Sequence, residues 1–172
     1  MVSVRAYKES DKERVQNICL ANAGCAESSD NTKKYILLMY CNYYIEKEPE
    51  NCFVAVNEND EAVGYIICAE DYEKYEQTFK AEYINQCASI SPRKYVDAKL
   101  DLLSHSMFKK DYPSHFHIDI DSNYQRMGLG SMLISTLERH LHGKGIKNMM
   151  MVCGEDNDLA ISFYRKNGFK DL

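Results

Sequence analysis

The chain has 172 residues, enough to close one sizeable hydrophobic core, and we interpret residues 1–172 as a single domain. Hydrophobic residues make up 45% and aromatic residues 11%, which is typical of a globular protein and argues against disorder. The formal net charge is -5 and the basic residues are scattered, so nucleic acid is not an expected partner.

Targeting segments and cysteine usage indicate where in the cell the protein is expected and which kinds of cysteine site it can contain. No apolar run approaches the ~20 residues that a membrane span needs, and the first residues lack the apolar centre of a signal peptide. We therefore expect a cytoplasmic protein with no membrane partner. The cysteines number seven and form no CxxC pair, which favours small buried hydrophobes in a reducing compartment over a disulfide framework or a zinc ribbon.

The first half of the chain predicts a strand followed by two helices. Alternating apolar residues over 2–6 indicate a strand, and Ser10 with Glu13 forms a capping-box pattern ahead of the first helix. A second helix is expected over 31–47, with its apolar side turned inward. Pro49 ends it, because proline cannot continue a helix.

A hairpin and an insertion are expected next. Residues 52–56 and 62–68 are β-rich runs joined by a polar stretch, which predicts a hairpin. Residues 70–114 are charged and tyrosine-rich, with two helix-like halves that separate around Ser91 and Pro92. Because this segment also carries apolar residues, we interpret it as a helical insertion within the domain.

The last third of the chain gives the strongest pattern. Residues 115–121 alternate strictly between apolar and polar, a helix with a leucine stripe follows a glycine turn, and 148–153 is a short apolar strand before a final helix over 158–166. Strand, turn, helix, strand and helix in this order form a βαβα unit, whose strands we expect to be parallel.

The turn between the strand and the helix reads Gln125-Arg-Met-Gly-Leu-Gly130. Its glycines let the main chain approach a ligand, and the free N–H groups of the helix's first turn favour a pyrophosphate. The turn is not a Walker A loop, because no Gly-Lys-Ser/Thr follows, and it lacks the third glycine of a dinucleotide fold.

With this turn the chain resembles the GCN5-related N-acetyltransferase (GNAT) superfamily, whose central motif is Gln/Arg-x-x-Gly-x-Gly/Ala between the fourth strand and the third helix. A second match lies downstream and consists of Asn157, Ala160, Phe163, Tyr164, Gly168 and Phe169. The resemblance is strong over residues 115–169. It implies an α/β (α+β) fold, with a mixed central sheet, helices on both faces and the helical insertion before the fourth strand.

The resemblance also implies an activity, an acetyl-CoA-dependent N-acyltransferase of the EC 2.3.1 class that acetylates a primary amine of a small molecule or protein. Acetyl-CoA is then the cosubstrate and no metal is expected. The implied cofactor-binding residues are Ile118, Asp119, Ile120, Arg126, Met127, Gly128, Leu129, Gly130, Ser131, Asn157 and Tyr164. Tyr164 is the implied general acid for the departing thiolate. Ser122 and Met127 depart from common forms of the motif, without removing an amide donor.

The base that deprotonates the acceptor amine is inferred from the residue pattern of one strand, not from the family resemblance. His115, His117, Asp119 and Asp121 lie in a row on one face of the expected fourth strand, where a buried strand is normally apolar. Asp119 and His117 are the candidate catalytic bases, with bulk-connected water as the third alternative. For His115, a place in a buried hydrogen-bond network is at least as good an interpretation as a catalytic role. A metal ion bound by this row of side chains is a minor alternative.

The remaining histidines and the tyrosines of the insertion are interpreted as structural residues. His140 and His142 are expected at the surface, and the insertion's tyrosines are expected to pack, with an acceptor-pocket lining as the alternative. A competing function is a degenerate acyl-CoA-binding sensor or interaction module without catalysis. No motif in the chain identifies the acceptor. The sequence fits a monomer and a homodimer equally.

Overall fold

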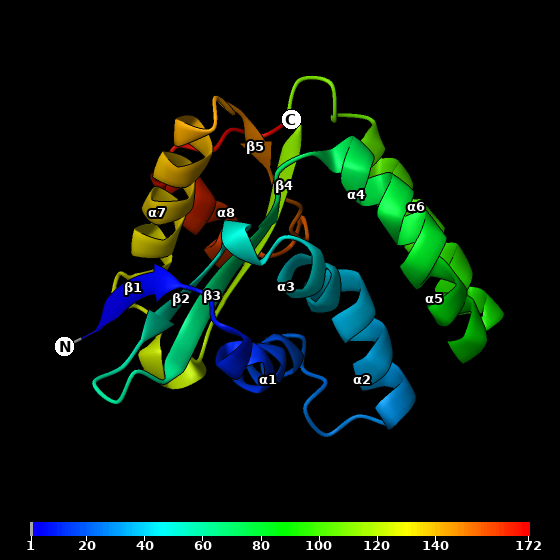
Figure 1. The fold of residues 1–172 in the computed structure, drawn as a ribbon, viewed down its shortest axis with the longest axis horizontal. Helices are drawn as coiled ribbons and strands as arrows, with labels where there is room; N and C mark the ends of the chain where they lie inside the picture. The colour runs from blue at the N-terminus through cyan, green and yellow to red at the C-terminus, as the bar shows by residue number, and fades with distance from the viewer. Residues whose placement is uncertain (1) are drawn as a thin grey trace.

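A computed structural model describes residues 2–172, and five strands within that range form one sheet in the order β1-β2-β3-β4-β5 (Figure 1). The strands are β1 (Ser3–Ala6), β2 (Cys52–Val56), β3 (Ala62–Ala69), β4 (Ser114–Ile120) and β5 (Met149–Met150). The strands from β1 to β4 pair antiparallel with their neighbours, whereas β4 and β5 pair parallel. The sheet is therefore mixed, as the sequence predicts.

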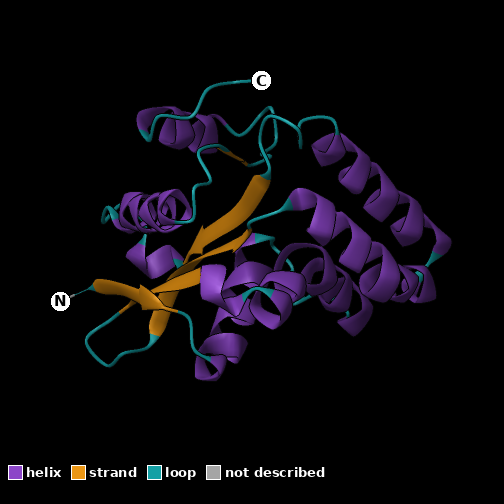
Figure 2. Ribbon diagram, turned by 45° about the horizontal axis from the view of Figure 1, so that its top comes forward, coloured by secondary structure: helices purple, strands orange, loops and turns teal. Residues whose placement is uncertain are grey.

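Helices cover both faces of this sheet, which confirms the expected architecture (Figures 1 and 2). The first face holds α1 (Lys12–Asn22), α2 (Asp30–Leu37) and α3 (Tyr43–Lys47), and the second holds α7 (Leu129–Gly143) and α8 (Asp158–Lys166). The segment before β4 adds α4 (Tyr72–Thr78), α5 (Ile84–Ile90) and α6 (Pro92–Ser106). Among residues 2–172, no helix is long and apolar enough to cross a membrane.

Alternation along β4 divides its side chains between two cores. Phe116, Ile118 and Ile120 turn toward the α7 face, where they join the leucines of that helix. His115 and His117 turn to the opposite face, among the tyrosines of the first helices and the insertion. The side-chain period of a strand is two, so the pattern of the sequence settles which residues face each core.

The helix predicted over 31–47 is present but contains a π-helical segment. It begins at Asp30, capped by the Ser29 hydroxyl, and is π-helical over Leu38–Asn42 before α3 begins. A π segment carries one extra residue per turn and shifts the faces of the helix that follows it. Tyr43 and Tyr44 are consecutive and yet both fully buried. The Tyr44 hydroxyl lies against β4, where it contacts His115.

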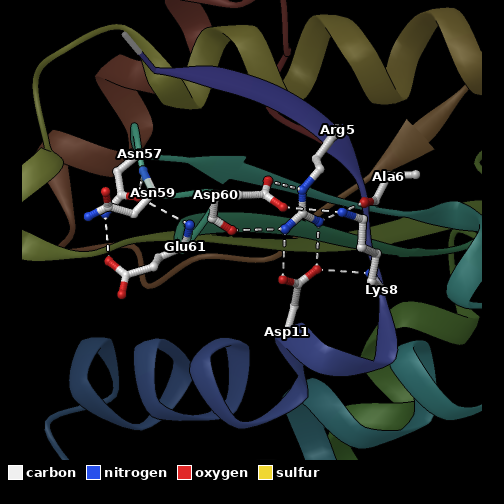
Figure 3. A network of polar contacts seen from close by, with 8 residues as sticks. All are labelled: Arg5, Ala6, Lys8, Asp11, Asn57, Asn59, Asp60 and Glu61. Atoms are coloured by element: carbon white, nitrogen blue, oxygen red, sulfur yellow. Dashed lines mark hydrogen bonds and ion pairs between the residues drawn. The ribbon is translucent and has the colours of Figure 1, made fainter.

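A charged network fixes the first strand to the hairpin and to the start of α1 (Figure 3). The Arg5 guanidinium donates to both Asp11 carboxylate oxygens, at 2.7 and 2.9 Å, and its Nε donates to Asp60 at 2.6 Å. Asp11 also accepts from the Lys8 main-chain N–H at 2.9 Å. Asp11 is buried, and the bidentate guanidinium compensates its charge.

Two local predictions are wrong. The capping box of Ser10 and Glu13 does not form within the described chain, since Asp11 accepts the amide at this turn. The strand expected over 148–153 is reduced to β5, because β4 and β5 pair only where the insertion ends and then separate.

The insertion breaks at Ser91 and Pro92 as predicted, and the Ser91 hydroxyl accepts from the third residue of α6. Its tyrosines pack: Tyr72, Tyr75 and Tyr83 are buried. Tyr72 and Tyr75 contact His115 of β4, and Tyr83 packs against Tyr43 and Phe79. The insertion thus completes the core on the first face of the sheet.

Candidate active site

The separation of β4 from β5 creates a cavity of about 570 Å³. The two strands pair only at Ser114 with Met149 and His115 with Met150, so beyond these residues β4 has no strand on that edge within residues 2–172. The main chain of Ile118–Ile120 borders the cavity, and β3 pairs with its other edge. A free strand edge offers N–H and C=O groups to an extended ligand arm.

The glycine turn forms one end of this cavity. Arg126 and Gly128 have positive φ angles of 63° and 82°, and Gly128 stands directly before α7. In the described chain no side chain caps α7, which leaves the first-turn N–H groups free for an anion. Gly130 has a different role, since a Cβ there would lie 2.7 Å from the Phe163 ring, so glycine is needed for α7 to approach α8.

Tyr164 projects from α8 into the same cavity. Its ring packs edge-on against Phe163 and Phe169, with centroid distances of 5.2 and 5.7 Å. Its phenol oxygen has no hydrogen-bond partner within residues 2–172. Burial, together with the nearby Asp119 carboxylate, raises the pKa of Tyr164, so the phenol keeps its proton at neutral pH.

Most of the predicted cofactor residues border the cavity, and two do not. The lining includes Ile118, Asp119, Ile120, Arg126, Gly128, Leu129, Gly130, Ser131 and Tyr164. Met127 is 58% exposed, outside the cavity wall. Asn157 is likewise outside, and its carboxamide accepts from the Ala160 N–H at 3.1 Å as the N-cap of α8. The individual cofactor contacts stay predictions.

Asp119 is held by one strong contact from the neighbouring strand. The Tyr65 hydroxyl of β3 donates a short hydrogen bond to its carboxylate. Burial raises the pKa of Asp119 to about 7, although the bond from Tyr65 lowers it. Asp121 has a separate role, since it pairs with Arg14 at 2.7 Å and accepts from the Asn123 N–H.

The two histidines of β4 share one hydroxyl. Tyr44 Oη lies 2.7 Å from His115 Nε2 and 3.0 Å from His117 Nε2. Burial lowers the pKa of His117 to about 3 and holds the pKa of His115 well below its usual value, so both rings are neutral. The network reading of His115 is therefore confirmed, because its ring is buried against Tyr44 and Tyr75.

Several hydrogen-bond partners of the β4 side chains could not be predicted from the sequence. Tyr44 and Tyr65 lie in segments that resemble ordinary core, and His105 is one polar residue in a long helix. His142 is exposed, as predicted, whereas His140 is half-buried and its Nε2 bonds to Asn51 at 2.8 Å. Within 2–172, no cluster of three or more His, Cys, Asp or Glu is arranged to hold a metal ion.

Residues 15–169 match the family described as the Acetyltransferase (GNAT) family. The chain belongs to this family. Acetyl transfer to amines is the general reaction of its members, and acetyl-CoA is the donor that they generally use. The match begins within α1 and extends through α8, and it includes all the residues that line the cavity.

Solved structures share this fold over nearly the whole chain. A protein named SsHAT is 25% identical with a TM-score of 0.87, covering 98% of this chain and 91% of its own. A protein from Pyrococcus horikoshii OT3 is 20% identical with a TM-score of 0.67, covering 100% and 90%. An agmatine N-acetyltransferase is 16% identical with a TM-score of 0.65, covering 97% and 81%.

Proposed function

We propose that this GNAT protein transfers the acetyl group of acetyl-CoA to a primary amine of a small molecule or protein. The observation that carries the proposal is one cavity bordered by three features: the free edge of β4, the uncapped start of α7 and the Tyr164 phenol. The first suits an extended amide-containing arm, the second a pyrophosphate and the third a leaving thiolate.

Cofactor binding in this proposal uses mainly main-chain groups. The N–H groups of the first turn of α7, from Leu129 to Ser131, and the positive end of the helix dipole would hold the pyrophosphate. Arg126 borders the same end of the cavity and supplies a cation. The main chain of Ile118 to Ile120 would pair with the pantetheine arm as an added strand.

The reaction needs a general acid for the leaving thiolate, a hydrogen-bond donor for the oxyanion and a base for the ammonium group. The uncharged amine attacks the thioester carbonyl carbon, the C–S bond breaks, and the thiolate takes the Tyr164 proton. A main-chain N–H near Asp119 or Ile120 would stabilise the oxyanion. Before attack, His117 or Asp119 takes the proton of the ammonium group. Burial raises the pKa of Asp119 to about 7, which makes its carboxylate the stronger base of the two, whereas burial lowers the pKa of His117 to about 3 and disfavours its protonated form.

The test measures thiol release from acetyl-CoA with a panel of small amines and lysine peptides, together with acetyl-CoA binding by calorimetry. Gly128→Val should weaken binding, because its side chain would enter the space that the pyrophosphate needs. Gly145→Val is the matched control: both glycines have a φ of 82° and no described atom within 4 Å of an added Cβ, but Gly145 lies at the far end of α7.

Two results would contradict the proposal in different ways. Equal acetyl-CoA affinity in folded Gly128→Val and Gly145→Val would show that the turn does not bind the pyrophosphate. Tight binding by the wild-type protein without thiol release for any amine would favour the alternative, a sensor or interaction module.

A further inference from the structure

The outer face of α6 carries a continuous row of apolar side chains. Its members are Val96, Leu100, Leu103 and Met107, which are 51%, 59%, 60% and 73% exposed, respectively. Met107 caps the helix with helical main-chain angles, so the row runs along one face of α6 at the spacing of successive turns. We call these residues the α6 stripe. Single exposed apolar residues are ordinary, whereas a row along one helix indicates a contact surface.

The opposite face of α6 already has its partners. Ala98 and Leu102 are buried in the core on the first face of the sheet, and His105 stacks on Tyr72. A helix at the surface of a monomer normally turns a polar face outward, but α6 is apolar on this side as well. Figure 1 shows α6 at the edge of the molecule, on the side away from β1 and α7, where another molecule can reach it.

We propose that the α6 stripe binds the same stripe of a second copy of this chain, with the two helices antiparallel. Alternating intervals of four and three residues are the spacing with which helices pack side by side. A two-fold axis midway along the stripe places Leu100 opposite Leu103 of the second copy. The same axis places Val96 opposite Met107 of the second copy. The stripe is therefore complementary to itself, as a two-fold symmetric interface requires.

The residues beside the stripe are compatible with this arrangement. Asp97 and Lys99 lie on its two sides, and Ser104 and Ser106 continue those two sides one heptad further along the chain. In antiparallel packing, Asp97 meets Ser104 of the second copy, and Lys99 meets Ser106 of the second copy. Each charge beside the stripe thus faces a small neutral side chain, so no like charges oppose each other there.

The size of the stripe fits a weak dimer. From their exposed fractions, its side chains present roughly 450 Å² of apolar surface per copy, which is within the range of the largest patches on monomers. Two stripes with their flanking residues would bury roughly 1,000–1,200 Å² in total, at the lower end for a specific interface. We therefore expect a dissociation constant on the order of 10 µM.

The charges at the ends of the stripe distinguish a second copy from an anionic lipid surface. Arg93 and Lys110 are exposed, and neither forms an ion pair within residues 2–172. Antiparallel packing brings Arg93 of one copy toward the end at which Lys110 follows α6 of the other. Salt screens this repulsion and should tighten the dimer. Binding of the same cations to anionic lipid would instead weaken as the salt concentration rises.

Sedimentation velocity over about 1 to 200 µM protein measures the proposed dimer. The wild-type chain should change from monomer to dimer across this range, and the dimer should not weaken when salt rises from about 50 to 500 mM. Leu103→Glu should weaken association at least about 30-fold, because the symmetric interface buries the introduced carboxylate twice. Leu172→Glu is the matched control, since it makes the same change at a leucine that is 65% exposed and lies outside the stripe.

The Leu103→Glu variant should fold normally. Leu103 is exposed in the single chain, and glutamate is as good a helix former as leucine, so the melting temperature of the dilute monomer should stay unchanged. A loss of dimer in this variant then reports the interface.

A mixing experiment tests the antiparallel arrangement. Leu100→Lys and Leu103→Glu should each stay monomeric alone. An equimolar mixture should form a mixed dimer, because the introduced ammonium and carboxylate groups face each other. A parallel arrangement would place each position opposite itself, so a mixture that stays monomeric would show that the antiparallel proposal is wrong.

Two other results would also overturn the proposal. One is a wild-type chain that stays monomeric at about 200 µM at both salt concentrations, or a dimer that Leu103→Glu leaves unchanged. The other is cosedimentation with phosphatidylserine-containing vesicles, without a dimer in solution, that Leu103→Glu abolishes, since a lipid surface would then be the occupant. No outcome depends on acetyl transfer, so this proposal and the proposed function can fail separately.

Discussion

Replacing Asp119 with asparagine should stabilise the folded protein at alkaline pH. The carboxyl group lies partly buried on β4, and burial raises its pKa from 3.8 to about 7. The folded state therefore holds a proton that the unfolded state has lost between these two values. Stability falls as the pH rises through this window and then levels off, because the charged carboxylate is poorly solvated in the folded protein.

The size of the effect follows from the shift. A rise from 3.8 to about 7 corresponds to at most about 4 kcal/mol of stability lost above pH 7, and water in the cavity reduces it toward about 2 kcal/mol. Asparagine keeps an oxygen that can accept from Tyr65 and never becomes charged. Asp119→Asn should raise the melting temperature by about 5–15 °C at pH 8, and by less than half of that at pH 5.

Thermal unfolding of wild type and variant at pH 5 and pH 8 measures this difference. Asp121→Asn is the control, because Asp121 pairs with Arg14 and its charge is compensated. We expect no stabilisation in that variant at either pH. A pH-independent effect of Asp119→Asn, or a loss of stability at pH 8, would refute the argument that Asp119 carries a desolvation penalty.

Three further variants test the site and its support. Tyr164→Phe should lower kcat by ~10²–10⁴ with acetyl-CoA affinity nearly intact; an equal loss in affinity would indicate a packing role instead. His117→Gln should be slowest relative to wild type at low pH, where the amine is protonated, whereas Asp119→Asn should lose most above about pH 7, where the wild-type carboxyl is ionised and the amine is still protonated; unchanged pH–rate profiles in both would indicate solvent as the base. Gly64→Ala places a Cβ 2.5 Å from the Ile120 side chain and 3.2 Å from the Asp119 carbonyl oxygen, so urea unfolding should show a loss of about 1–3 kcal/mol, and an unchanged midpoint would contradict the close contact.

The contiguous parts of the site were predictable from the sequence. The turn from Gln125 to Gly130 joins a strand to a helix, and its glycines and helix start act through main-chain geometry that a few neighbouring residues set. The alternation of residues 115–121 likewise fixed which side chains of β4 face each core. The family resemblance depended on these local patterns, and residues 15–169 confirm it.

The surroundings of the reactive side chains depended on the tertiary structure. Tyr65 reaches Asp119 across 54 residues of chain, and Tyr44 reaches His115 across 71, through strand pairing and a π-helical segment that periodicity did not reveal. Asn157 fits the family pattern, yet its side chain caps α8 outside the cavity wall.

Chain periodicity tells which face a residue is on but not what lies opposite it. Hydrogen-bond partners and pKa shifts depend on what lies opposite, so they were settled only when the sheet and the insertion packed together.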